Sequence, residues 1–233
     1  MEKNKLIVPD AEIFVPGTPK PEADYLELER LGAKLGIPVP MVHVKVEATN
    51  PDGSPGERYE GRSRTFNRNF WNRLLALLSG FGTSGTTFGA GYLTNKNTSG
   101  ASANHSYSGY IYWINNTGNY GRGIGVGTGT AAEDFEGYNL SAPISGGSGA
   151  GQLVYNTQDP TTESYNSGTK KWSMTLKMIL NNNSGGTIVV AETAIVDGSL
   201  PALICRDLLG SAVSVLNAGQ LTVTYTITLT FPA

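Results

Sequence analysis

The sequence predicts a mainly β protein, an antiparallel two-sheet sandwich of jelly-roll or immunoglobulin-like type, with an extended N-terminal arm and two short helices. Glycine is abundant, at 30 of 233 residues. Charged residues make up only 15% of the chain, against about 25% in typical globular proteins. Beyond residue 109, short segments with strand-like patterns follow one another, separated by glycine- and asparagine-rich turns. This combination is typical of strands joined by turns and not of a helical bundle.

The charges divide the chain into two regions. Residues 1–73 hold 22 of the 36 Lys, Arg, Asp and Glu side chains, and the remaining 160 residues hold 14. We therefore expect an arm plus helix over residues 1–40, followed by a single β-sandwich domain over residues 41–233. Within that domain we expect a helix near residues 65–78 and a Gly/Ser-rich loop near residues 79–109.

Short apolar patches and prolines alternate in the first 20 residues. Pro9, Pro16 and Pro19 interrupt regular helix and central strand, which predicts an extended arm. Alone, such a segment cannot bury enough apolar surface to order itself. It is either an unstructured terminus or an arm that lies on a neighbouring subunit. In the second case six apolar residues would make the subunit contacts: Leu6, Ile7, Val8, Ile13, Phe14 and Val15.

Two segments have helical periodicity. Residues 21–35 begin with proline and acidic side chains, which suit the first turn of a helix. They carry a narrow apolar stripe: Tyr25, Leu28, Leu31 and Leu35. Residues 65–78 carry a broader stripe: Phe66, Phe70, Leu74, Leu77 and Leu78, widened by Trp71 and Leu75. We expect this second helix to pack against the sheet.

Strand patterns recur along the chain, at residues 41–48, 110–114, 123–127, 152–155, 171–180, 187–196, 203–208, 212–216 and 221–231. Residues 187–196 are apolar on both faces, which predicts a central strand. Residues 221–231 place apolar side chains on one face and five threonines on the other. A long strand with a flat threonine face is an aggregation hazard at a sheet edge, so it is either central or covered by a partner.

Few side chains could carry chemistry. The two histidines, His43 and His105, and the single Cys205 are too few ligands of the usual kind for a zinc site. No Gly-x-Ser-x-Gly motif is present. The glycine-rich residues 121–129 match neither a dinucleotide-binding nor a phosphate-binding loop, and we interpret them as a close-packed strand and turn. Cys205 lies in an apolar run and is expected to be an inert buried thiol.

Glu133, Asp134 and Glu136 form an acidic cluster. Such carboxylates could bind calcium or hydrolyse a glycoside, but neither an EF-hand pattern nor an identifiable aromatic platform accompanies them. The alternative is one exposed helical turn over residues 131–136. The sequence therefore predicts no catalytic residue, no metal and no cofactor.

A local basic segment contains Arg62, Arg64 and Arg68. It could contact packaged DNA or an acidic neighbouring subunit, or it is a solvated face balanced by Glu57 and Glu60. The net charge of −2 provides no global basic field, so direct contact with nucleic acid is not expected. No run approaches the roughly 18 apolar residues of a membrane span, and no secretory signal is recognisable, so no membrane association is expected.

Three segments resemble small virion proteins of tailed bacteriophages. The first is RSRTFNRNFW over residues 62–71, running into the leucines of residues 74–78. The second is IGVGTGTA over residues 124–131, with YNL at 138–140 and PI at 143–144. The third is NSGGTIVVAE over residues 183–192, followed by LICRD at 203–207 and GQLTVTYTI at 219–227. The resemblance spans residues 58–231 and implies a β-sandwich component of the head, neck or tail that has no catalytic residues.

Together these observations predict a structural component of a phage virion, an auxiliary or decorating capsid protein that assembles through its N-terminal arm and loops. The expected partners are other virion proteins and further copies of the chain, with a trimer as the expected oligomer. The expected location is the virion, after synthesis in the host cytoplasm. A neck or tail protein is an alternative. The aromatic, Asn/Ser/Gly-rich residues 81–120 also fit a host-surface or carbohydrate-binding adhesion module, and the acidic cluster fits a β-sandwich hydrolase.

Overall fold

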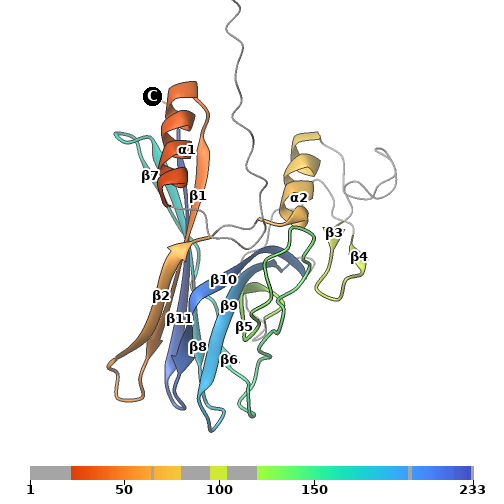
Figure 1. Cartoon of the computed structure of the whole chain (residues 1–233), viewed down its shortest axis with the longest axis vertical. Coiled ribbons are helices and arrows are strands. Elements are labelled where there is room, and N and C mark those ends of the chain that lie inside the picture. Colours follow the sequence, from red (N-terminus) through yellow and green to blue (C-terminus); the bar gives the residue numbers. More distant parts are fainter. Residues whose placement is uncertain (1–21, 64–65, 80–94, 104–119, 199–200, 232–233) are drawn as a thin grey trace, which may run out of the picture.

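The computed structural model describes residues 22–63, 66–79, 95–103, 120–198 and 201–231. Within these ranges the chain is mainly β, with two antiparallel sheets packed against each other and two helices (Figure 1). The predicted sandwich is therefore confirmed. The predicted arm with its six contact residues lies outside the described residues, as do Arg64, His105 and the strand expected at 110–114.

The larger sheet of the described chain has the strand order β2 (Pro55–Arg62), β1 (Val39–Thr49), β11 (Gln220–Thr230), β8 (Lys171–Asn181) and β6 (Val154–Tyr155), and β7 (Thr162–Asn166) also pairs with β8. Strand β11 lies between β1 and β8 and pairs along its whole length with both. The central position predicted for the threonine-rich strand is thus confirmed.

The smaller sheet of the described chain has the order β10 (Ala202–Val215), β9 (Ile188–Asp197) and β5 (Gly123–Gly127). Strand β9 is central, as its apolar faces predicted. The two strands expected at 203–208 and 212–216 are wrong, because β10 is one continuous strand. Its register to β9 shifts between Leu208 and Val213, so a bulge joins the two predicted segments without ending the strand. Two short strands, β3 (Asn95–Lys96) and β4 (Ser102–Ala103), form a separate hairpin.

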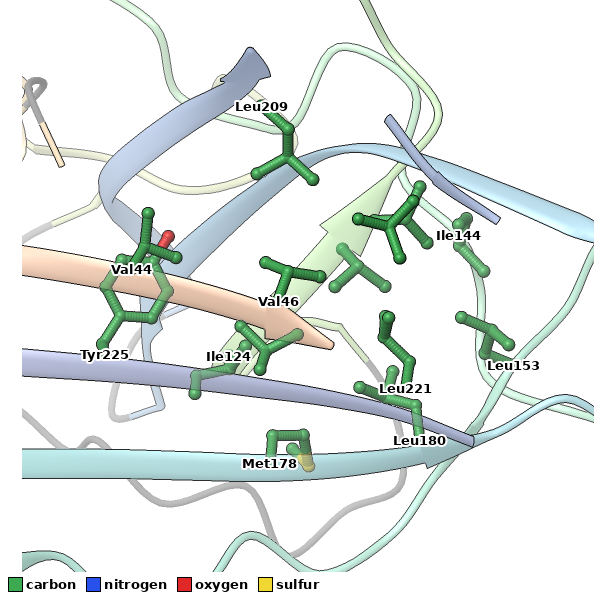
Figure 2. Close-up of a cluster of buried hydrophobic side chains, with 14 of the residues drawn as sticks. Val44, Val46, Ile124, Ile144, Leu153, Met178, Leu180, Leu209, Leu221 and Tyr225 are labelled. Atoms are coloured by element: carbon green, nitrogen blue, oxygen red, sulfur yellow. The ribbon is translucent and has the colours of Figure 1, made fainter. Parts of the chain in front are cut away.

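The hydrophobic core fills the space between the two sheets (Figure 2). Alternation along each long strand assigns one face to this core. In β1 the side chains of Val42, Val44 and Val46 are buried, whereas His43 and Lys45 point outward. In β11 the apolar set faces the core, and Tyr225 is fully buried. The threonines of β11 lie on the outer face of the larger sheet and are partly exposed within the chain.

The helices form where the sequence predicts them. Helix α1 (Glu22–Leu35) stands beside β1 (Figure 1), and helix α2 (Arg68–Ser79) contacts β10. Helix α2 begins after Asn67, whose side-chain Oδ1 accepts a hydrogen bond from the backbone N–H of Phe70 at 3.4 Å, as an N-cap residue does. Neither helix is long and apolar enough to cross a membrane.

The expected packing of α2 against the sheet is confirmed, but polar as well as apolar side chains make the contact. Phe70 does pack against the core, together with Phe66. Among the described side chains of α2, Asn69, Asn72 and Arg73 are also buried. The large apolar side chains Trp71, Leu74 and Leu75 are between 37% and 51% exposed. Polar anchoring of α2 therefore leaves an apolar face on the surface.

Candidate interaction surfaces

A buried carboxylate organises the loop that follows β5. Glu192 of β9 is fully buried, and its carboxylate accepts backbone hydrogen bonds from Gly129 at 3.2 Å, Ser141 at 3.0 Å and Ala142 at 2.8 Å. It is also paired with Arg206 of β10, whose Nε lies 2.5 Å from Glu192 Oε2. Hydrogen bonds to the Glu192 side chain thus hold both ends of the loop, residue 129 and residues 141–142, on the sheet.

The guanidinium of Arg206 extends this arrangement. Its two terminal nitrogens donate to the backbone carbonyls of Ala131 at 2.7 Å and Ala132 at 3.1 Å. Nearby, the buried carboxylate of Glu133 accepts a hydrogen bond from the backbone N–H of Leu208 at 2.8 Å. Residues 127–142 are therefore held on the smaller sheet by charged groups whose partners are within the chain.

The acidic cluster predicted from the sequence is divided among separate structural roles. Glu133 is bound to β10 as described, Asp134 accepts a hydrogen bond from the backbone of Glu136 at 3.0 Å, and Glu136 pairs with Arg68 of α2. The turn at these residues is irregular and is not helical. Across the part of the chain that the structure describes, no group of three or more His, Cys, Asp or Glu side chains is placed to hold a metal ion.

The glycines of residues 121–129 allow this close packing. The segment is thus a close-packed strand and turn, as we interpreted it from the sequence. A Cβ atom on Gly127 would overlap the Glu192 carboxylate and would lie 2.6 Å from the carbonyl oxygen of Ala142. A Cβ on Gly129 would lie 2.6 Å from the Cβ of Ser141. The backbone can approach the buried carboxylate only because these positions have no side chain.

We expect Gly127→Ala to lower the free energy of unfolding by about 2–3 kcal/mol, because the methyl group must displace either the Glu192 carboxylate or the Ala142 backbone. Chemical denaturation measures the change. The matched control is Gly186→Ala, where a Cβ would meet nothing within 4 Å and the expected effect is close to zero. Equal effects of the two substitutions would contradict the packing argument.

Polar contacts likewise anchor α2. The guanidinium of Arg73 forms a buried ion pair with Asp197 at the end of β9, with 2.5 Å between Nη1 and Oδ2. Burial lowers the pKa of Arg73, and the carboxylate of Asp197 opposes that shift. The Asn69 side chain donates to the carbonyls of Lys96 at 2.9 Å and Leu203 at 3.0 Å. Helix α2 is therefore fixed to both the β3–β4 hairpin and the smaller sheet.

Cys205 lies in a buried polar cluster at the centre of the domain. The Tyr225 hydroxyl donates to the Asp207 carboxylate at 2.9 Å. Burial, and next the charge of Asp207, raise the pKa of the Cys205 thiol well above its ordinary value, and the same two causes raise the pKa of Tyr225. The prediction that the thiol is buried is confirmed, and a protonated thiol of this kind is a poor nucleophile.

The buried thiol has a consequence for stability at alkaline pH. Because its folded-state pKa is raised, its contribution is intact below the unfolded-state pKa of about 8.5 and is lost as the pH rises above it. Between pH 8.5 and 9.5 we expect the free energy of unfolding to fall by about 1 kcal/mol more than in Cys205→Ala. Urea denaturation across this range measures both slopes, and parallel curves would contradict the expectation.

The predicted basic patch has two described members, and each is paired with a carboxylate. Arg62 Nη1 lies 3.8 Å from Glu29 Oε1 of α1, and its guanidinium stands 5.0 Å from the centre of the Tyr25 ring. Arg68 Nε donates to Glu136 Oε1 at 2.8 Å. Arg62 thus serves the contact between α1 and the larger sheet, whereas Arg68 joins α2 to the loop of residues 127–142.

Two apolar surfaces remain exposed on the helices. The first is a leucine stripe on α1, made of Leu28, Leu31 and Leu35. The second is an α2 surface made of Trp71, Leu74 and Leu75, with the exposed Phe135 next to its N-terminal end. Exposed apolar surface of this kind marks sites of association more often than sites of chemistry.

A groove of about 330 Å³ lies where α1 stands over the threonine face of the larger sheet. Its lining combines polar and apolar side chains: Glu29, Met41, Val42, His43, Arg62, Lys171, Thr226 and Thr228. His43 is exposed here, and its Nδ1 lies 3.7 Å from Glu60 Oε1. Helix α1 thus covers only one end of the threonine face.

Comparisons of the chain with protein-family models, with curated proteins and with solved structures found no match.

Proposed function

We propose that this chain is a structural component of a bacteriophage virion, an auxiliary or decorating capsid protein, and that it is not an enzyme. The observation that carries the proposal is the apolar surface on both helices, held on a rigid sandwich. Side chains such as Leu35 and Leu75 are more than half exposed, and a subunit contact would remove them from water.

The internal polar network supports the same proposal. The charged groups that sequence reasoning could have assigned to catalysis, including Glu133 and Glu136, instead hold loops and a helix in place. Fixed loops suit a protein that presents a constant surface to neighbours. The resemblance of residues 58–231 to small virion proteins points in the same direction.

Co-sedimentation with purified particles tests the proposal. Particles of the phage that encodes the chain should contain it in many copies, and cryo-electron microscopy should place it on the outer surface of the head. Density at the neck or tail would replace the capsid assignment with the alternative location. Particles that lack the protein and do not bind it when it is added would overturn the proposal.

A further inference from the structure

The leucine stripe of α1 is exposed, while a neighbouring face of the same helix contacts the sheet. The face of the helix next to the stripe rests on the sheet, since Gly32 packs so closely against Val39 that a Cβ would overlap it, and Tyr25 is stacked on Arg62. The stripe itself is open, with Leu28, Leu31 and Leu35 exposed by 49%, 38% and 66%. Apolar residues at positions i, i+3 and i+7 form the seam through which one helix packs against another.

The charges of α1 show what kind of helix would fit this seam. The first half of the helix, residues 22–29, carries four acidic side chains, and the second half, residues 30–35, carries two basic ones. A parallel copy would place like charges together. An antiparallel copy places the acidic half of each helix against the basic half of the other, so α1 is complementary to itself.

We propose that α1 pairs with α1 of a second copy of this chain, antiparallel and about a two-fold axis, through the leucine stripe. Glu27 and Lys34 immediately precede Leu28 and Leu35 and therefore flank the seam on one side. In the antiparallel pair, Glu27 of each copy faces Lys34 of the other. The pairing identifies a partner for the proposed structural role and rests on that proposal. Purified protein alone is enough to test it.

The contact is small, so the pair is expected to be weak in isolation. A helix of 14 residues is about 21 Å long at a rise of about 1.5 Å per residue, and the seam buries less than a stable stand-alone interface of about 1,200 Å². We expect a dissociation constant on the order of 10–100 μM. Such a contact becomes effective where many copies are held close together.

Sedimentation equilibrium of the full chain from about 5 to 500 μM tests the pairing, since this range brackets the expected constant. The wild type should shift from monomer to dimer. Leu31→Glu should weaken association at least about 100-fold, because a carboxylate in the seam is buried without a partner. Leu26→Glu is the matched control. Leu26 is 54% exposed on the opposite side of the same helix, and its substitution should leave the dimer unchanged.

Disulfide trapping tests the orientation. Cys205 is fully buried, so engineered cysteines can be followed without interference. A mixture of Glu27→Cys and Lys34→Cys chains should form mixed disulfides roughly tenfold faster than either variant alone, because only the mixture places two thiols opposite each other. Equal rates in all three samples would overturn the antiparallel arrangement.

A wild type that stays monomeric up to 500 μM would overturn the pairing altogether. It would leave the virion proposal standing if the monomer still binds particles. Conversely, a dimer that binds no particle would retain the pairing and remove the virion role, so the two failures are distinguishable.

Discussion

Glu192→Gln is expected to lower the free energy of unfolding by about 3–5 kcal/mol, because it removes one charge of a fully buried ion pair and leaves the other. The neutral amide also accepts the three backbone hydrogen bonds from the loop more weakly than the carboxylate does. Urea denaturation followed by tryptophan fluorescence measures the loss. Hydrogen exchange should additionally show faster exchange in residues 128–142.

The control for this prediction is Glu136→Gln, which removes the carboxylate of an exposed ion pair with Arg68. Its expected effect is within about 1 kcal/mol, since solvent already screens that pair. A double variant, Glu192→Gln with Arg206→Met, should be more stable than the sum of the single changes implies, because no unpaired charge remains. Additive losses would mean that Glu192 and Arg206 do not act as a pair.

Arg73→Met is the second substitution with a large expected effect, again about 3–5 kcal/mol. It leaves the buried carboxylate of Asp197 without the guanidinium that lies 2.5 Å away, while preserving most of the apolar volume of the side chain. Because Arg73 ties α2 to the end of β9, the helix should also lose protection against hydrogen exchange before the sheets do. Denaturation and exchange measured on the same samples separate the global from the local effect.

Arg68→Met provides the comparison for Arg73, since both arginines lie on α2 and pair with a carboxylate, but Arg68 and Glu136 are each nearly half exposed. Its expected effect is within about 1 kcal/mol. Adding Asp197→Asn to Arg73→Met should restore part of the stability. Equal losses for Arg68→Met and Arg73→Met would contradict the argument that burial makes the Arg73 pair the stronger contributor.

Alternation predicted the central strands because burial on one face selects side chains at every second position. Strands β1, β8 and β11 each extend within about two residues of the predicted bounds. Strands β2 and β7 were not predicted, because neither carries the alternating apolar pattern that a buried face selects. Both lie at the edge of the larger sheet, β7 is exposed throughout, and β2 consists of charged residues, glycine and proline around one tyrosine. Charges of this kind keep an edge strand from pairing with another chain, and they also hide it from a hydrophobic pattern.

The buried ion pairs were harder to predict, but the sequence contains a signal for them. Glu192 is the only charged residue in the apolar run of residues 188–196, and Arg206 follows the apolar residues 202–205. A charge inside a strand that is buried on both faces requires a partner. Which partner it takes depends on strand pairing between β9 and β10, and that pairing is not readable from local pattern. The buried polar side chains of α2 are a similar case, because their partners lie on other strands.

The pairing of β1 with β11 has a consequence for how the chain is made. These strands are the first and the last of the described chain, and every residue of β1 finds its ladder partner in β11. Contacts of such high sequence separation form late and slowly. During translation the edge of β1 that pairs with β11 has no ladder partner until β11 has left the ribosome, and such an unpaired strand edge favours aggregation of the nascent chain.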